Sequence, residues 1–512
     1  MGNIALNSAA GRWVMASTIM ASAMAFIDAT ALNVVLPALQ RSMGATGAQL
    51  FWVLNAYLLM LAALILIGGA LGDKLGRKKI FMIGIAIFIF GSAACGLSGT
   101  IALLIIFRVI QGIGGALMIP GSLSLITSSI NDKERGSAIG TWSAVTTLVT
   151  MGGPILGGVL ADAGLWRYIF FINVPIGIIA LLILATKVAE NKDEEDNGKI
   201  DYLGAVLIAC GLALLTFGFL RMPEKGFRDP FVYGSIIGGI VFMLAFIRAE
   251  QKSSNPMMPL SLFRNRTFSG CNLLTLFLYA GLNGGMLFLS LNMIQVQGYT
   301  QTQSGLSFLP FTVLMILIAR VAGGLADKWG PRLFLTFGPM IAGTGLLMLS
   351  LVDQTNGYSD YWSTFFPGIC VLGLGMSFTV APLTATVMGS LPDHLSGIAS
   401  GTNNAISRIA GVFAVAIFGA LVSLFFINTL MQQLHVLNLD TTAYNEIMAQ
   451  AANLGNAKVP DNIPASEHAA IVTSYHKSFI NAYQKIMLLA GILGYAGGLT
   501  GFIFIRRTQE KS

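Results

Sequence analysis

The fold is decided by one short stretch, GALGDKLGRK at residues 69–78, which recurs as GGLADKWGPR at residues 323–332. Each copy stands between two apolar segments, so each is expected to join two membrane-spanning helices. A glycine-flanked aspartate followed by basic residues, placed alike in two parts of one chain, indicates two related halves. Two six-helix halves would put six spans between the copies. Eight apolar segments separate them, so we expect two additional helices in the middle.

Composition supports this reading. Of 512 residues, 55% are hydrophobic and only 10% are charged, and the mean hydropathy is +0.74. Soluble proteins carry about a quarter charged residues, so lipid must cover much of this surface. A transmembrane β-barrel would need short segments in which apolar and polar residues alternate, whereas these apolar runs are long and do not alternate. A bilayer core about 30 Å thick needs about 20 apolar residues per helix. The predicted spans are 13–37, 50–72, 80–99, 101–125, 138–162, 167–186, 201–220, 231–249, 268–292, 304–326, 333–352, 362–388, 399–427 and 478–505.

The expected fold is therefore an all-α polytopic membrane protein with 14 transmembrane helices arranged as 6 + 2 + 6. We place an N-terminal six-helix bundle at 1–190 and the two additional helices at 191–250, preceded by the charged linker from Lys187 to Lys199. A C-terminal six-helix bundle follows at 251–512, with an external loop at about 428–477.

The distribution of lysine and arginine predicts the orientation. Most of these residues fall on the side that holds both termini, including Lys74, Arg77, Lys78 and Lys79 in the first repeated loop. Cytoplasmic loops carry such an excess, so both termini are expected in the cytoplasm. The formal charge of +7 is thereby explained by contact with the bilayer, and we expect no nucleic-acid partner.

Several classes of site are not expected. The four cysteines lie in separate apolar segments, and the histidines of the external loop fit no metal-site spacing, so we predict no metal ion. No phosphate-binding G-x-x-x-x-G-K-[ST] loop is present, so an ion gradient rather than ATP must supply energy. A membrane-embedded enzyme or a receptor is a remote alternative. The spans hold no pair of catalytic groups, and a receptor would lack the duplicated loops.

Five segments carry a resemblance to a known family. The repeated loop resembles the signature of the major facilitator superfamily. The other four resemble motifs of its fourteen-span drug:proton antiporter branch, of the EmrB/QacA type. They are IDATALNVVLP at 27–37, RVIQGIGG at 108–115, GPILGG at 153–158 and WRYIFFINVPIG at 166–177.

This resemblance implies a proton-coupled exporter of amphipathic small molecules, acting by alternating access in a bacterial cytoplasmic membrane. It implies no cofactor and no catalytic residue, and a protein that functions as a monomer. A dedicated exporter of one metabolite, siderophore or amino acid remains an alternative, because sequence does not separate it from multidrug efflux.

Asp28 and Arg108 are the predicted proton-coupling residues. Asp28 precedes the outer end of the first span and Arg108 follows the outer start of the fourth at a similar depth. A carboxylate at bilayer depth is costly unless it is paired or hydrated. We therefore expect Asp28 to accept the proton and Arg108 to pair with its ionised form, so that protonation loosens the contact between helices. The alternative is a static buried ion pair.

The repeated loops are expected to form a gate. Gly69 and Gly76 permit close helix approach and a tight turn. The resemblance implies that Asp73 contacts the thirteenth span in the outward-open state, that Arg77 holds the loop, and that Asp327 is the second-half counterpart of Asp73. The basic residues alternatively serve only to set topology.

The fifth span carries Gly153, Pro154, Gly157 and Gly158, which remove side chains along one stripe and break one backbone hydrogen bond. We expect a kink and a closely packed partner helix. The assignment of this stripe to export comes from the resemblance alone.

A central substrate cavity is expected between the halves. Its candidate lining consists of polar and aromatic residues on the second, fourth, ninth and thirteenth spans: Trp52, Asn55, Tyr57, Gln111, Tyr279, Asn283, Asn403 and Arg408. Such residues also pack or hydrogen-bond within helix bundles, which is the alternative. Two cations and one carboxylate at this depth favour neutral, zwitterionic or singly charged amphipathic substrates.

Overall fold

The computed structural model describes residues 4–131, 134–190, 201–253, 256, 258–391, 396–437 and 439–505. Most of the predicted charged linker lies outside these ranges. Within them the chain is helical, and thirteen helices are long and apolar enough to cross a membrane. Another helix, α5, has a shorter apolar part at Leu148–Asp162. The prediction of an all-α polytopic membrane protein is therefore confirmed.

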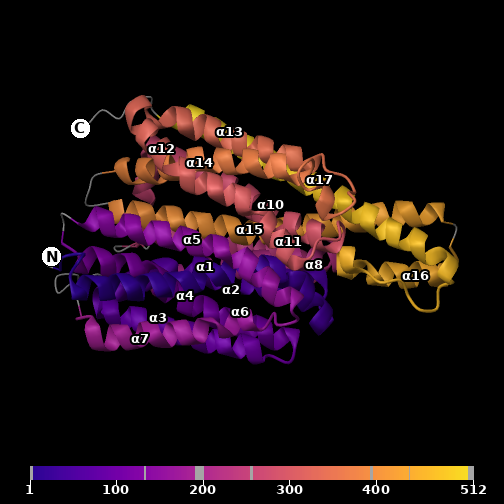
Figure 1. Ribbon diagram of the computed structural model, residues 1–512, viewed down its shortest axis with the longest axis horizontal. Coiled ribbons are helices and arrows are strands. Elements are labelled where there is room, and N and C mark those ends of the chain that lie inside the picture. The colour runs from indigo at the N-terminus through magenta and orange to yellow at the C-terminus, as the bar shows by residue number, and fades with distance from the viewer. Residues whose placement is uncertain are drawn as a thin grey trace.

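The first part of the chain forms a helix bundle, coloured indigo to purple in Figure 1. Its helices are α1 (Ala9–Met43), α2 (Gly47–Leu75), α3 (Arg77–Leu97), α4 (Ile101–Ser129), α5 (Arg135–Asp162), α6 (Tyr168–Phe171) and α7 (Asn173–Lys187). One span was predicted where α6 and α7 lie. The helix is interrupted at Ile172, close to Pro175, whose ring nitrogen has no hydrogen to donate to Phe171.

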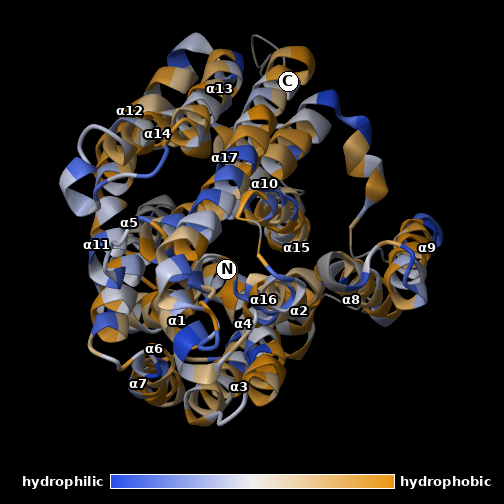
Figure 2. Cartoon of the chain, turned by 90° about the vertical axis from the view of Figure 1, so that its right-hand side faces the viewer, coloured by the Kyte–Doolittle hydropathy of each residue, from blue (hydrophilic) through white to orange (hydrophobic). Residues whose placement is uncertain are grey.

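Two helices, α8 (Tyr202–Lys225) and α9 (Pro230–Lys252), follow as an antiparallel pair. Gly226 ends α8 with a φ of 77°, and Asp229 caps α9 by accepting hydrogen bonds from two backbone N–H groups. The pair lies at the edge of the molecule, where α8 packs against α2 and α15 and α9 packs against α8 (Figure 2).

The last part of the chain forms a second bundle, coloured salmon to yellow in Figure 1. Its long elements are α10 (Arg266–Gln295), α11 (Gln301–Ser307), α12 (Leu309–Trp329), α13 (Pro331–Ser350), α14 (Phe365–Gly389), α15 (Ser396–Val436) and α17 (Ala465–Phe504). Two short 3₁₀ helices, η1 (Leu260–Arg264) and η2 (Tyr358–Asp360), precede α10 and α14. The predicted span 304–326 is divided between α11 and α12, at Phe308, just before Pro310.

The predicted external loop at about 428–477 contains helices. Helix α15 continues to Val436 and α17 already begins at Ala465, so both extend past the predicted ends of their spans at 427 and 478. Between them lie α16 (Thr441–Ala449) and the 3₁₀ helix η4 (Gln450–Asn456). These elements project from the end of the molecule opposite both termini (Figure 1). We call that end the loop side, and the end that holds Ile4 and Ile505 the termini side.

Glycine makes the same turn in both repeated loops. Gly76 separates α2 from α3 with a φ of 111°, and Gly330 separates α12 from α13 with a φ of 85°. Side chains other than glycine rarely adopt this backbone conformation. Both repeated loops therefore turn at an equivalent glycine.

Candidate functional site

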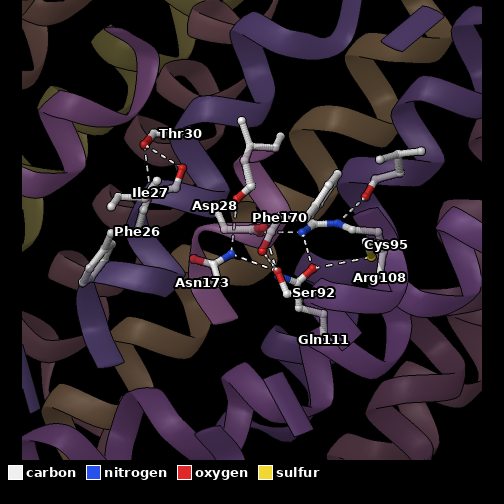
Figure 3. Close-up of polar contacts among 12 residues, drawn as sticks. Phe26, Ile27, Asp28, Thr30, Ser92, Cys95, Arg108, Gln111, Phe170 and Asn173 are labelled. Atoms are coloured by element: carbon white, nitrogen blue, oxygen red, sulfur yellow. Dashed lines mark hydrogen bonds and ion pairs between the residues drawn. The ribbon is translucent and has the colours of Figure 1, made fainter. Parts of the chain in front are cut away.

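A buried ion pair joins α1 and α4. Arg108 Nη1 lies 2.5 Å from Asp28 Oδ2, and the two side chains are 1% and 0% exposed (Figure 3). Their similar depth in the sequence predicted this contact. Two opposite charges removed from water are tolerated only when hydrogen bonds satisfy their remaining polar atoms, and the surrounding residues supply these bonds.

Gln111 connects the two charges a second time. Its Nε2 donates to Asp28 Oδ1 at 2.9 Å, while its Oε1 accepts from Arg108 Nη1 at 2.8 Å. Arg108 Nε also donates to the carbonyl oxygen of Val53 on α2, at 3.1 Å. Each carboxylate oxygen of Asp28 therefore has a donor, and α1, α2 and α4 are held by one hydrogen-bond network.

Tyr57 covers the arginine. The guanidinium carbon of Arg108 lies 4.5 Å from the Tyr57 ring centroid, and the ring of Phe170 is 6.0 Å away on α6. An aromatic face attracts a cation at these distances. The ring of Tyr57 therefore attracts Arg108 in addition to Asp28, Gln111 and the carbonyl oxygen of Val53.

Two glycines allow this network to form. A Cβ added at Gly112 would lie 2.6 Å from the carbonyl oxygen of Tyr57, and one added at Gly91 would lie 2.7 Å from the backbone nitrogen of Gln111. Glycine at these positions lets α2 and α3 approach α4 closely.

A second polar cluster lies beside the first. Asn173 Nδ2 donates to Ser92 Oγ at 2.9 Å, and Ser92 Oγ donates to the carbonyl oxygen of Phe170 at 2.8 Å (Figure 3). These bonds tie the α6–α7 interruption to α3. The predicted motif at 166–177 therefore has a structural use next to the ion pair.

The predicted α5 stripe packs against α1, one turn along from Asp28. Cβ atoms at Gly153 and Gly157 would overlap Thr30 Oγ1 and the carbonyl oxygen of Ala31, respectively. Pro154 cannot donate to the carbonyl oxygen of Thr150. The Thr30 hydroxyl lies 3.0 Å from that oxygen and 2.8 Å from the carbonyl oxygen of Phe26 on its own helix, so the two carbonyls share its single hydrogen. Thr30 therefore partly replaces the backbone bond that the proline breaks.

The same stripe contacts the second half of the chain. A Cβ at Gly158 would lie 2.5 Å from the carbonyl oxygen of Gln301, and one at Gly305 would overlap that of Pro154. At the end of α5, Asp162 accepts hydrogen bonds from the backbone N–H groups of Gln301 at 2.9 Å and Thr302 at 2.8 Å. The loop-side ends of α5 and α11 are therefore closed against each other.

A third contact between the halves lies on the loop side. Gln40 Oε1 of α1 accepts from Gln295 Nε2 of α10 at 3.0 Å and from Asn456 Nδ2 of η4 at 2.7 Å. Gln40 Nε2 donates to the carbonyl oxygen of Asn453 at 3.2 Å. The segment after α16 therefore covers the junction of the halves.

Three predicted cavity residues are used in packing or are buried. Trp52 lies against Phe217 of α8, with ring centroids 6.5 Å apart, away from the ion pair. Asn403 donates to Asn272 Oδ1 and Thr275 Oγ1 of α10. Asn55 is fully buried, and neither side-chain polar atom has a hydrogen-bond partner among the described residues.

Of the remaining predicted cavity residues, Arg408 lies on α15, and Tyr279 and Asn283 lie on α10. Arg408 of α15 is half-buried, and Asn283 of α10 is exposed and donates to the carbonyl oxygen of Tyr279 at 2.8 Å. A Cβ at Gly411, one turn beyond Arg408, would lie 3.5 Å from Asn283 Nδ2 and 4.0 Å from Leu58 Cδ1. Helices α2, α10 and α15 therefore meet at this level.

The first repeated loop, which is predicted to be a gate, contacts the end of the first bundle. A Cβ at Gly76 would lie 2.9 Å from Glu190 Oε1, and the backbone N–H of Lys78 donates to the same oxygen at 3.0 Å. Gly69 lies opposite Pro120, and Arg77 is partly buried. The side chains of Asp73 and Asp327 fall outside what the structure describes, so their predicted contacts stay predictions.

Sequence reasoning missed several members of the site. It did not predict the direct bonds from Gln111 to both charges, the roles of Val53 and Cys95, or the pairing of Thr30 with Thr150. Cys95 Sγ lies 3.8 Å from Gln111 Oε1. Thr30 carried a usable signal, because it follows Asp28 on the same helix and its hydroxyl can reach a carbonyl that a proline leaves free.

Two helical bundles in one chain, with a buried acid and arginine in one of them, are an architecture found in membrane transporters. The chain belongs to the Major Facilitator Superfamily, which residues 18–415 match. It is 29% identical over 495 residues to the tetracenomycin C resistance and export protein of Streptomyces glaucescens, covering 95% of this chain and 90% of that one. It is 31% identical over 476 residues to the multidrug resistance protein Stp of Mycobacterium tuberculosis, covering 91% and 87%.

The fold has solved counterparts. A bacterial homologue of the human lysosomal transporter Spinster, in an inward-facing and unoccupied conformation, superposes with a TM-score of 0.68 at 17% identity, over 98% of this chain and 99% of that one. A D-xylose-proton symporter gives a TM-score of 0.61 at 13% identity, over 98% and 99%. These likenesses establish the fold.

Proposed function

We propose that this protein is a proton-coupled exporter of amphipathic small molecules, a multidrug efflux transporter of the fourteen-span drug:proton antiporter branch. The observation that carries the proposal is the buried network of Asp28, Arg108 and Gln111. The direction of transport is supported by the relatives named for resistance and export, which align with most of this chain.

In the proposed mechanism Asp28 binds and releases the proton. Protonation removes the negative charge that holds Arg108 Nη1, so the arginine is left with Gln111, the Val53 carbonyl oxygen and the Tyr57 ring. Because these partners belong to α2 and α4, the bond across to α1 weakens. The proton thereby changes the packing of α1, whose opposite contacts include α5 and α10.

The protein would alternate between two states. One is closed on the loop side and open on the termini side, and the other is open on the loop side and closed on the termini side. The contacts of Asp162 with α11 and of Gln40 with Gln295 support a closed loop side. We propose that the repeated loops containing Gly69, Gly76 and Arg77, with Asp73 and Asp327, gate the other end. No resident cofactor takes part, since the proton gradient supplies the energy.

The topology follows the same proposal. Helix α5 has 28 residues, which is more than the about 20 that a span requires. If α5 is counted as a span together with the thirteen helices above, the number of spans is fourteen. The bundles at 1–190 and 251–512 would then flank the α8–α9 pair, in the 6 + 2 + 6 order. Both termini would lie in the cytoplasm of a bacterium, with the loop side outside, and one chain would suffice for transport.

The test is proton-driven uptake of lipophilic drugs of different charge into inverted membrane vesicles. Wild-type protein is expected to accumulate at least one compound, and Asp28→Asn to lose the dependence on the proton gradient. Asp353→Asn makes the same chemical change on an exposed loop residue and is expected to transport normally. If Asp28→Asn still exchanged substrate for protons like wild type, the coupling role would be wrong. Uptake of a single metabolite and of no drug would favour the dedicated exporter.

A further inference from the structure

A cavity of about 270 Å³ lies on the loop side, where the two halves of the chain meet the α8–α9 pair. Its walls come from the first turns of α2, the last turns of α8, the second half of α15 and the segment that runs from α16 into η4. Residues that line it include Ala48, Phe51, Leu220, Gly419, Ile427 and Ala449. Helix α8 stands between α2 and α9 at this edge of the molecule (Figure 2).

The cavity presents hydrocarbon to an occupant. Ser423 is the one polar side chain among the described residues that line it, and its hydroxyl donates to the carbonyl oxygen of Gly419 on its own helix, at 3.0 Å. Apolar cavities stay dry and accept apolar guests. Pockets for whole drug molecules span about 300–1,000 Å³, so this cavity suits a single hydrocarbon chain. Ala449 lines it and is exposed, so the cavity reaches the surface.

An arginine lies beside the cavity at the end of α8. Leu220 lines the cavity, and Arg221 follows it in the chain. The guanidinium carbon of Arg221 lies 5.7 Å from the ring centroid of Phe217 and 5.4 Å from that of Phe231, and these rings hold it in place. Its Nε lies 3.8 Å from Asp229 Oδ1, too far for a hydrogen bond, and has no hydrogen-bond partner among the described residues. The fixed guanidinium can therefore donate to an anion.

The turn between α8 and α9 carries further positive charge. Lys225 and Arg228 are both exposed there. The stretch 221–229 holds three basic residues and two acidic ones, Glu224 and Asp229. The Asp229 carboxylate is used at the start of α9, where it accepts hydrogen bonds from two backbone N–H groups at 2.9 and 3.3 Å. Basic residues at a membrane surface attract anionic headgroups.

We propose that the cavity and the basic end of α8 bind an anionic phospholipid from the loop-side leaflet of the bilayer. One acyl chain fills the cavity, the phosphate accepts hydrogen bonds from Arg221, and Lys225 and Arg228 attract the net negative headgroup. Hydrogen bonds between a guanidinium and a phosphate are charge-assisted and short. We call the cavity together with these three basic residues the lipid site.

The lipid site joins both halves of the chain. A Cβ at Gly419 of α15 would lie 2.7 Å from Phe51 Cδ2 of α2, so the two helices touch beside the cavity. A chain bound there contacts both of these helices, α8 and the segment after α16 while the loop side is closed. A ligand that binds one state better than another stabilises that state. The bound lipid therefore favours the closed loop side.

Binding to the purified full-length protein, measured by native mass spectrometry, tests the proposal with four probes. Dioleoylphosphatidylglycerol has the chains, the phosphate and a net negative charge. Dioleoylphosphatidylcholine adds a cationic group that Lys225 and Arg228 would repel, dioleoylglycerol lacks the phosphate, and glycerol 3-phosphate lacks the chains. Wild type is expected to bind the first at least about tenfold more tightly than the second or third, which corresponds to about 1.4 kcal/mol. Glycerol 3-phosphate should not bind detectably.

Substitutions separate the phosphate from the net charge. Arg221→Gln is expected to lower the preference for dioleoylphosphatidylglycerol over dioleoylglycerol by about tenfold. Arg41→Gln makes the same change on an exposed residue at the loop-side end of α1, which packs against α4, α5 and α7, and should leave this preference unchanged. Combined Lys225→Gln and Arg228→Gln should bring dioleoylphosphatidylglycerol to within about threefold of dioleoylphosphatidylcholine.

A cavity-filling substitution tests the place of the chain. Ala449→Phe puts a ring at the mouth of the cavity from an exposed position and is expected to weaken binding of dioleoylphosphatidylglycerol by at least about tenfold. Ala465→Phe makes the same change at the exposed start of α17, outside the residues that line the cavity, and should bind like wild type.

The ratio of two affinities measured on one preparation does not depend on the fraction of folded protein, so a destabilised arginine variant remains informative. Equal binding of dioleoylglycerol by wild type, or an unchanged ratio in Arg221→Gln, would overturn the phosphate contact. Equal binding of dioleoylphosphatidylcholine would overturn the preference for an anionic headgroup. Wild-type affinity in Ala449→Phe would show that the chain does not enter the cavity. These outcomes do not depend on transport, so the absence of drug uptake would contradict the proposed efflux function and leave the lipid site standing.

Discussion

At the scale of single residues, the proposed protonation site differs from a simple ion pair because Gln111 bonds to both charges. An amide can donate to a carboxylate and accept from a guanidinium at the same time, so it fixes the geometry of both. A protonated Asp28 must still find partners in the same place. The site therefore depends on three side chains from two helices. Sequence analysis assigned Asp28 and Arg108 to proton coupling and Gln111 to the wall of the substrate cavity.

Gln111→Ala is expected to lower proton-driven uptake by about tenfold without abolishing it. The change leaves Asp28 Oδ1 without its donor, and a hydrogen bond to a charged group contributes about 1.5–3 kcal/mol. Uptake into inverted vesicles measures the effect. Gln354→Ala removes an amide from an exposed loop and serves as the control. Wild-type uptake by Gln111→Ala would mean that the pair of Asp28 and Arg108 functions without the bridge.

Thr30→Val is expected to destabilise the protein by about 1–3 kcal/mol, because it preserves the shape of the side chain but removes the hydroxyl hydrogen that the carbonyl oxygens of Thr150 and Phe26 share. Thermal unfolding in detergent measures the loss. Thr186→Val is the control. The hydroxyl that it removes is exposed and donates to a carbonyl oxygen of its own helix, so this variant should unfold at the wild-type temperature. An equal change in both variants would contradict the role given to Thr30.

At the scale of helices, close packing depends on where glycine lies relative to its neighbour. Gly152 and Gly157 stand on the same helix. A Cβ at Gly152 meets nothing within 4 Å, whereas one at Gly157 would lie 2.6 Å from the carbonyl oxygen of Ala31. The two positions look equivalent in sequence, and only the arrangement of α1 and α5 separates them.

Gly157→Ala is therefore expected to force α1 and α5 apart and to lower both thermal stability and uptake, at a cost of about 1–3 kcal/mol for overpacking. Gly152→Ala should be neutral or stabilising, because alanine favours a helix over glycine by about 1 kcal/mol. Melting temperatures of the two variants test this. The same loss of stability in both would show that the close contact with α1 at Gly157 does not decide the effect.

The sequence predicted which helices form better than it predicted where these helices end or which residues they contact. Apolar length identified the spans, and the paired glycines identified the turns at Gly76 and Gly330, because each signal is local. The helical extensions beyond the predicted spans at 427 and 478 carry polar residues that hydropathy does not separate from a loop. Contacts such as Thr30 with Thr150 join residues that are 120 positions apart, and no periodicity encodes them.

At the scale of the whole molecule, the two bundles are held together on the loop side by polar contacts of different kinds. Gln40 forms uncharged hydrogen bonds to α10 and η4, and Asp162 accepts two backbone N–H groups at the start of α11. An uncharged cluster keeps its strength at any pH, whereas a carboxylate does so only while it is ionised. These contacts must break whenever the loop side opens.

Asp162→Asn is expected to favour the open loop side at neutral pH. Ser304 lies on α11 three residues after Gln301 and is fully buried against Ser290 and Met293 of α10, so a cysteine at this position reports opening by its reaction with a membrane-impermeant maleimide. Charge-assisted hydrogen bonds are about twice as strong as neutral ones, and labelling of Ser304→Cys should rise by about tenfold, or about 1.4 kcal/mol. The rate is compared with that of Ser359→Cys on the exposed η2, and an unchanged ratio would show that Asp162 does not hold the halves together.

The dependence on pH follows from the same residue. Asp162 ends α5 with an exposed side chain; partial burial raises its pKa, but the hydrogen bonds from Thr302 and Gln301 outweigh this effect, so the pKa lies below its ordinary value in the closed state. The closed state therefore keeps its full advantage above the ordinary aspartate pKa of about 3.9 and loses it as pH falls through the lowered value. Normalised labelling of wild type should be flat between about pH 5 and 8 and should rise below about pH 4. A rise already near pH 6 would mean that another group opens the loop side, and repeating the measurement in Asp28→Asn would decide whether that group is the proton site at the centre.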